Sequence, residues 1–280
     1  MLLVFLLAVL SGVLLVLGWQ KGFFRWTPLP QWNPTIQLWH VLGAFAIYFA
    51  IWVFGSAVYA PLLKSILGAQ RSPIGYTAWL VFLLSASIFA ALSIYRCTLP
   101  SQVRHAIWRY HKTPHFLQDA KNGLIAFCLG FPLVMFVGQL LEWLLQAAFK
   151  ISQIPDQSAV YFLKMTFHNP LYFLLAIVSV VVLAPLIEET LFRGFLQSFI
   201  RKHLGPRQAI LITALCFSFF HYAPEQGLAN IPIIGSLFSL ALFLGFLYEK
   251  QGSLFASISL HAIFNGFSAI NLYLFGECFV

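Results

Sequence analysis

Charge is scarce in this chain of 280 residues. Asp, Glu, Lys and Arg together make up 9% of it, Asp and Glu number only 8, and hydrophobic residues reach 60%. Soluble globular domains contain about 25% charged residues, so this composition excludes a soluble domain. We expect an integral, multi-pass membrane protein of the all-α class, built as a bundle of transmembrane helices.

Cysteine is also sparse, and it follows no ligand spacing. The four cysteines are Cys97, Cys128, Cys216 and Cys278. No two of them form a C-x-x-C pair, so the sequence indicates neither a disulfide framework nor a zinc ribbon. Three of them lie in or beside apolar segments, and we expect them to be packing residues.

Acidic residues are outnumbered by basic ones, which leaves a formal net charge of +8. No motif typical of nucleic-acid binding accompanies this excess, so no nucleic-acid partner is predicted. Basic loops that face anionic lipid account for the charge instead. The lipid bilayer is therefore the first predicted partner.

Apolar runs are abundant, and about eight of them are candidates for transmembrane helices. They cover residues 2–19, 36–62, 75–95, 123–148, 171–200, 208–222, 232–248 and 253–275. The first lacks the basic start and small-residue cleavage pattern of a signal peptide, so we expect it to be a retained span. We expect one membrane domain over 1–280, in which 1–150 holds variable N-terminal spans and 171–275 forms the catalytic region.

The basic residues indicate an orientation. If the N-terminus lies outside, all but four of the sixteen Lys and Arg residues fall on the inner side, the exceptions being Lys64, Arg71, Lys150 and Lys164. Inner loops of membrane proteins carry such an excess. The pattern predicts that both termini lie outside.

Three charged residues interrupt the apolar run 171–200: Glu188, Glu189 and Arg193. Ionised side chains in hydrocarbon cost several kcal/mol and usually mark a function. Glu189 and Arg193 are four residues apart and so lie on one helix face in the favourable order for an ion pair. That pair would leave Glu188 available for chemistry.

Polar residues in later spans lie at a similar predicted depth. At ~1.5 Å per residue, Glu188, His221, His261 and Asn265 each lie roughly 12–20 Å from the inner end of their segment, near the middle of a ~30 Å core. Singly, His221 could be an interhelical hydrogen-bonding residue, Asn265 a helix-packing residue and the Glu-Arg pair a structural one. Together they predict an intramembrane polar cavity suited to proton transfer or to activation of a water molecule.

The same residues resemble the CPBP family of intramembrane proteases, which includes type II CAAX prenyl endopeptidases and bacterial Abi proteins for bacteriocin processing and immunity. Residues 188–193 (EETLFR) match the family motif E-E-x-x-x-R, 217–221 (FSFFH) match F-x-x-x-H, and 261–265 (HAIFN) match H-x-x-x-N/D. The flanking residues 184–185 and 252–254 match as well. The ordered set is specific, and it covers about 175–270.

The resemblance implies a helical bundle with a conical cavity that hydrolyses a peptide bond near the C-terminus of a substrate. It implies that Glu188 activates water with help from His221, while His261 and Asn265 stabilise the oxyanion. Glu189 and Arg193 would hold the helix geometry or bind a substrate carboxylate.

The motifs are compatible with a zinc-dependent and with a metal-free mechanism. Glu188, His221 and His261 could form a His₂Glu set for Zn²⁺ with an open water position. However, no H-E-x-x-H motif supplies two ligands from one helix turn. We therefore expect a metal-free glutamate mechanism, with zinc as the alternative.

Two other functions fit parts of the pattern. A non-enzymatic bacteriocin-immunity or scaffold protein would use the same fold without its chemistry, and a proton-coupled transporter would use the Glu and His cluster. No inverted repeat supports the transporter. We expect a peptide or prenylated protein as substrate, entering from the membrane or the inner side, and a location in the plasma membrane of a bacterium.

Overall fold

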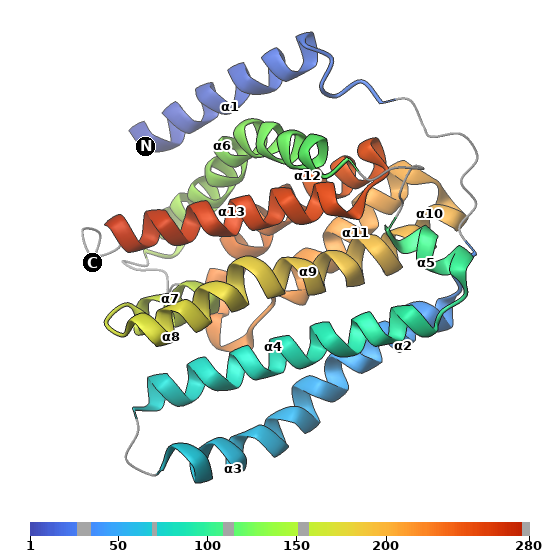
Figure 1. Ribbon diagram of the computed structural model, residues 1–280. Coiled ribbons are helices and arrows are strands. Elements are labelled where there is room, and N and C mark those ends of the chain that lie inside the picture. The colour runs from blue at the N-terminus through green and yellow to red at the C-terminus, as the bar shows by residue number, and fades with distance from the viewer. Residues whose placement is uncertain (27–34, 69–71, 109–114, 151–156, 276–280) are drawn as a thin grey trace. The chain divides into compact units, whose positions relative to one another are not determined.

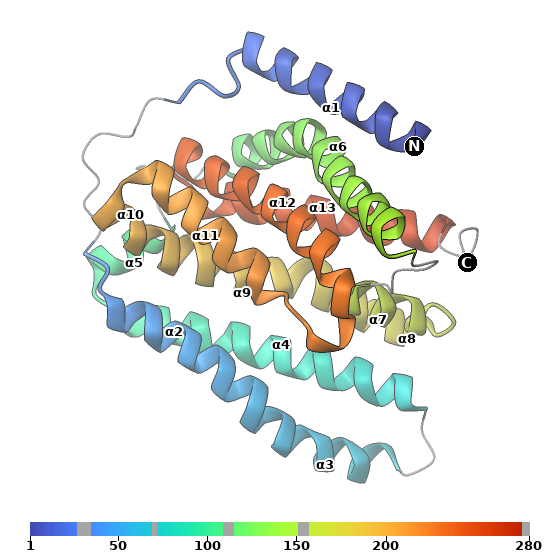
Figure 2. The ribbon, with the colours of Figure 1, turned by 180° about the vertical axis from the view of Figure 1, so that it is seen from behind.

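The chain is all-α, as expected. The computed structural model describes residues 1–26, 35–68, 72–108, 115–150 and 157–275, and no β-strand occurs within these ranges. Figures 1 and 2 show the helices from two opposite sides. In chain order they are α1 (Leu2–Gln20), α2 (Leu38–Ala50), η1 (Ile51–Gly55), α3 (Ser56–Leu67), α4 (Pro73–Thr98), α5 (Ser101–Trp108), α6 (Phe116–Phe149), α7 (Ser158–Thr166), α8 (Pro170–Ile177), η2 (Val178–Leu183), α9 (Ala184–Glu189), η3 (Thr190–Gln197), α10 (Ser198–Leu204), α11 (Pro206–Phe220), η4 (Pro224–Ala229), α12 (Asn230–Gln251) and α13 (Leu254–Phe275).

Seven helical runs in the described residues are long and apolar enough to cross a membrane. They are Leu2–Gln20, Leu38–Leu67, Pro73–Thr98, Phe116–Phe149, Pro170–Leu204, Pro224–Gln251 and Leu254–Phe275. The eighth expected segment corresponds to α11, which has only 15 residues. At ~1.5 Å per residue α11 is ~22 Å long, shorter than a ~30 Å hydrocarbon core. The protein is therefore a multi-pass helical membrane protein, in which α11 is shorter than the other apolar helical runs.

The chain forms two compact units, each made of separate stretches of sequence. The first unit contains Met1–Asn33, Arg109–Gln157 and Ile200–Leu260, and the second contains Pro34–Trp108, Ser158–Phe199 and His261–Val280. Helix α13 contributes its first turns to the first unit and the remainder to the second. The single domain expected over 1–280 stays a prediction.

In the first unit, α12 packs against both α6 and α11, and α1 packs against α6 (Figure 2). A Cβ at Gly130 of α6 would lie 3.1 Å from the ring of Phe243 on α12, so this glycine permits the close approach of the two helices. The turn after α12 uses Gly252 at φ 59. Next to it, the Ser253 hydroxyl donates to buried Asp119 over 2.6 Å. The flanking motif 252–254 therefore forms the turn that starts α13.

In the second unit, α4 packs against α2, α3, α8, η2 and α9 (Figure 1). Aromatic contacts reinforce this packing: Phe45 meets Phe192 edge-on at 5.5 Å, and Tyr95 stacks on Phe195 at 6.0 Å between ring centroids. The residues around the charged motif 188–193 are thus held by N-terminal spans.

The expected packing role of the cysteines is wrong for the three that are described. Cys97, Cys128 and Cys216 are free and exposed. Long apolar helices of a membrane protein expose much of their surface, which lipid covers in place of protein. Cys278 lies outside the described residues.

Candidate active site

The helical run Pro170–Leu204 departs twice from α-helical geometry around the two glutamates. The π-helical segments η2 and η3 lie immediately before and after α9. Pro185 gives a cause for the first, because its ring clashes with the carbonyl four residues earlier and its nitrogen carries no hydrogen. Such wide turns occur often at functional sites. In Pro170–Leu204 the two π-helical segments flank α9, which ends with Glu188 and Glu189, the first residues of the motif 188–193.

Asn265 on α13 contacts the wide turn. Its side-chain Nδ2 donates a hydrogen bond to the carbonyl of Val180 over 2.9 Å. A π-helical turn pairs the carbonyl of residue 180 with the N–H of residue 185, and residue 185 is proline. The Asn265 amide thus satisfies a carbonyl that the helix leaves unpaired, and ties α13 to η2.

Replacing Asn265 by Ala is expected to destabilise the protein by about 0.6–2 kcal/mol, because the Val180 carbonyl then lacks a partner inside the membrane. The midpoint of unfolding in detergent, followed by circular dichroism, measures this loss. Ser93→Ala is the matched control, since its hydroxyl is exposed and bonds only within its own helix, to the Phe89 carbonyl. Equal midpoints for the two variants would contradict the role given to Asn265.

Glu189 and Arg193 form the expected ion pair. Arg193 Nη1 lies 2.9 Å from Glu189 Oε1, and both side chains are 0% exposed. An unpaired charge in such a place is very costly, whereas a paired and hydrogen-bonded one is tolerated. Next to the pair, a Cβ on Gly194 would lie 2.7 Å from the side chain of Ile107 on α5. This explains a small residue directly after Arg193.

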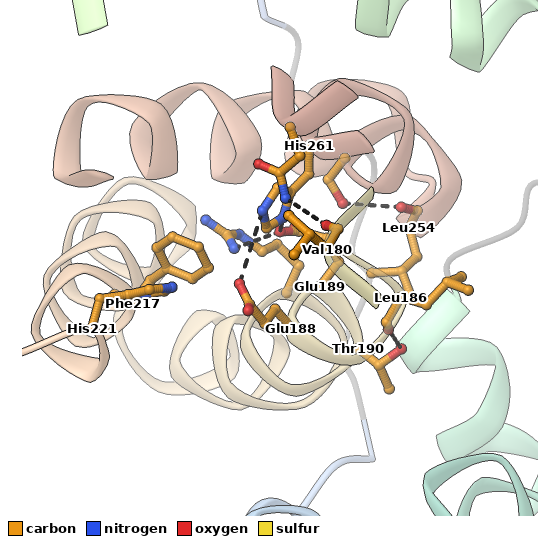
Figure 3. A network of polar contacts seen from close by, with 12 residues as sticks. Val180, Leu186, Glu188, Glu189, Thr190, Phe217, His221, Leu254 and His261 are labelled. Carbon is orange, nitrogen blue, oxygen red and sulfur yellow. Dashed lines mark hydrogen bonds and ion pairs between the residues drawn. The ribbon is translucent and has the colours of Figure 1, made fainter. Parts of the chain in front are cut away.

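His261 lies between the two glutamates (Figure 3). Its Nδ1 is 2.8 Å from Glu189 Oε1, and its Nε2 is 3.9 Å from Glu188 Oε2. The short contact assigns a proton to Nδ1, which donates to the Glu189 carboxylate. Nε2 consequently faces the carboxylate of Glu188. The imidazole thus lies between the two carboxylates and carries a proton on the side of Glu189.

Glu188 differs from Glu189 in its surroundings. Its side chain is 18% exposed, against 0% for Glu189. It also lines a cavity of about 310 Å³ within the second unit. Of the described residues around this cavity, Glu188 alone is charged, and most others are apolar or aromatic. An apolar cavity with one carboxylate in its wall suits a hydrophobic ligand brought to a base.

The cavity walls include residues that the sequence did not suggest. They come from α2, η1, α4 and α7 as well as from η2 and α9, and they include Tyr48, Trp52, Ser85, Ile88 and Phe162. No motif or spacing marks these positions, which look like ordinary residues of apolar spans. Their role follows from packing against α9, so only the structure identifies them.

His221 belongs to the first unit, where it ends α11. Its Nδ1 lies 2.8 Å from the Phe217 carbonyl, and its ring lies 4.8 Å from that of Phe217. The carbonyl accepts, so Nδ1 carries the proton and Nε2 is the acceptor in the neutral ring. The first and last residues of the motif 217–221 thus contact each other. That His221 lies close to Glu188 stays a prediction.

The donors that could hold a metal come from both units. No group of three or more His, Cys, Asp or Glu side chains in the described parts of the chain is arranged to hold a metal ion. Within the second unit, Glu188 and His261 supply two of the three donors of the zinc set, and His261 Nδ1 is already bonded to Glu189. The third donor, His221, belongs to the first unit, so the zinc alternative stays a prediction.

One family model matches the chain. It is the type II CAAX prenyl endopeptidase Rce1-like family, and the match covers residues 170–267. No curated protein and no solved structure matches the chain. The matched region begins with α8 and ends two residues after Asn265, so it contains all three sequence motifs. Residues 170–267 thus match the model of the type II CAAX prenyl endopeptidase Rce1-like family, and this match supports the resemblance of the three motifs to the CPBP family.

Proposed function

We propose that the protein is an intramembrane endopeptidase that hydrolyses a peptide bond near the C-terminus of a hydrophobic peptide or prenylated protein. The observation that carries this is the placement of Glu188 in the wall of an apolar cavity, with His261 Nε2 3.9 Å from its carboxylate. The family match supports a CAAX-protease type of endopeptidase. It favours this activity over a non-enzymatic immunity or scaffold role.

In the proposed reaction, Glu188 removes a proton from a water molecule as the water oxygen attacks the scissile carbonyl carbon. The tetrahedral intermediate then collapses, the C–N bond breaks, and the leaving amine takes up the proton held by Glu188. His221 assists by accepting a hydrogen bond from the water through Nε2.

The remaining residues orient the base and receive the oxyanion. Glu189 accepts hydrogen bonds from both Arg193 and His261, which holds the imidazole in one orientation. His261, when it carries a proton on Nε2, stabilises the oxyanion together with the second amide N–H of Asn265. The first amide N–H of Asn265 donates its hydrogen bond to the carbonyl of Val180.

A cleavage assay with full-length protein in liposomes tests this function. We expect cleavage within a few residues of the C-terminus, read by mass spectrometry, and faster turnover for peptides that carry an apolar chain, because such chains fit an apolar cavity. A farnesylated peptide and its unmodified counterpart form the matched pair. Comparing C-terminal peptides of membranes with and without the protein extends the test to natural substrates.

The same assay addresses the metal. We expect 1,10-phenanthroline to leave the rate within about twofold of the untreated rate, since no H-E-x-x-H motif supplies two zinc ligands from one helix turn. Complete loss that Zn²⁺ restores would establish the zinc alternative. No cleavage of any peptide under either condition would contradict the proposed function.

A further inference from the structure

A second cavity lies within the first unit, and none of its wall residues is among the proposed catalytic residues. Its volume is about 530 Å³, within the roughly 300–1,000 Å³ range of small-molecule sites. The walls come from the end of α1 and the following turn, from α11 and from α12. They consist of Trp19, Phe24, Trp26, Arg207, Ile210, Leu211, Leu242, Phe243 and Phe246.

The chemistry of this cavity is amphiphilic. Eight of its nine wall residues are apolar or aromatic, and the ninth is Arg207, next to the start of α11. A second cation lies at the same aromatic wall, because Lys250 Nζ sits over the rings of Phe23 at 4.2 Å and Phe246 at 5.8 Å. The same ammonium donates to the Phe23 carbonyl. The cleft thus has one cation, Arg207, in its wall, and a second, Lys250, lies over the ring of the wall residue Phe246.

The nearby acidic residue does not offset these charges. Glu249 precedes Lys250, but its Oε2 is 3.0 Å from Arg201 Nε, and the Glu249 side chain is 0% exposed. Arg207 and Lys250 also belong to the inner side in the orientation that the basic residues predict. The inner leaflet carries the anionic lipids, and tryptophans such as Trp19 and Trp26 are typical of the headgroup level.

We propose that this cavity binds one anionic phospholipid, with an acyl chain against the aromatic wall and the phosphate at Arg207 and Lys250. The inference does not depend on the peptidase reaction. The lipid would link α1 to the α11–α12 pair within the first unit.

Native mass spectrometry of the full-length protein tests the proposal. The protein is equilibrated with equal amounts of phosphatidylglycerol and phosphatidylcholine in detergent, and the retained lipids are counted. We expect one phosphatidylglycerol retained in preference, and about a fivefold loss of that preference in Arg207→Gln, the effect of one basic residue at an anionic surface. Lys121→Gln is the matched control, since this exposed lysine of the same unit lies outside the cavity.

A second variant and a second signal separate binding from misfolding. Leu242→Trp fills the cavity and is expected to abolish retention, whereas circular dichroism reports whether its helices persist. Phosphatidylglycerol brominated on its acyl chains is expected to quench tryptophan fluorescence, less so in Trp26→Phe. Equal preference in Arg207→Gln and Lys121→Gln, or no retained lipid in the unmodified protein, would overturn the proposal.

Discussion

Replacing Glu188 by Gln is expected to lower the cleavage rate by about 10²–10⁴-fold, the contribution of a positioned general base. Gln keeps the shape and hydrogen-bonding capacity of the side chain but cannot accept the proton from water. Its helix should be undisturbed, because Glu188 is partly exposed and lines a cavity. The measurement is turnover of a C-terminal peptide in liposomes, with the elution volume of the protein as the check on folding.

Glu142→Gln is the matched control for this variant. Glu142 also lies in an apolar span, where it accepts hydrogen bonds from Gln139 and Gln146, but it belongs to no motif. Its removal should leave turnover within about twofold of the original, as for most substitutions away from a site. If Glu188→Gln turned over as fast as Glu142→Gln, Glu188 could not be the base.

Replacing Arg193 by Met is expected to destabilise the folded protein by about 3–5 kcal/mol, the usual result of removing one partner of a buried ion pair. Met keeps an unbranched apolar stem like that of Arg but leaves Glu189 charged and 0% exposed. The hydrogen bond from His261 would then be the main compensation for that charge. Unfolding midpoints in detergent measure the effect.

The double variant Glu189→Gln with Arg193→Met tests the cause. It removes both charges, and the Gln carbonyl can still accept from His261, so we expect it to recover more than half of the lost stability. Arg104→Met is the control for loss of an arginine, because Arg104 bonds only to the Cys97 carbonyl at an exposed place. A double variant no more stable than Arg193→Met would show that packing, not charge, determines the loss.

The local part of the site could be predicted from the sequence because it depends on helix periodicity. The four-residue spacing of Glu189 and Arg193 led to the prediction of their ion pair, and the 2.9 Å contact confirms it. The same spacing in 217–221 placed the ring of His221 near Phe217. Spacing could not indicate that Pro185 lies next to a π-helical turn whose Val180 carbonyl accepts from Asn265, since that needs a second helix.

The sequence by itself determined the class of protein, a multi-pass helical membrane protein, and the chemistry of its motifs, because hydropathy and short-range spacing are local properties. Only the tertiary structure placed His261 against both glutamates and separated buried Glu189 from Glu188 at a cavity. Only the tertiary structure brought Tyr48, Trp52 and Phe162, from helices distant in the sequence, to that cavity. The physical reason is that apolar spans look alike in sequence, and which of their faces meet is decided by packing between helices.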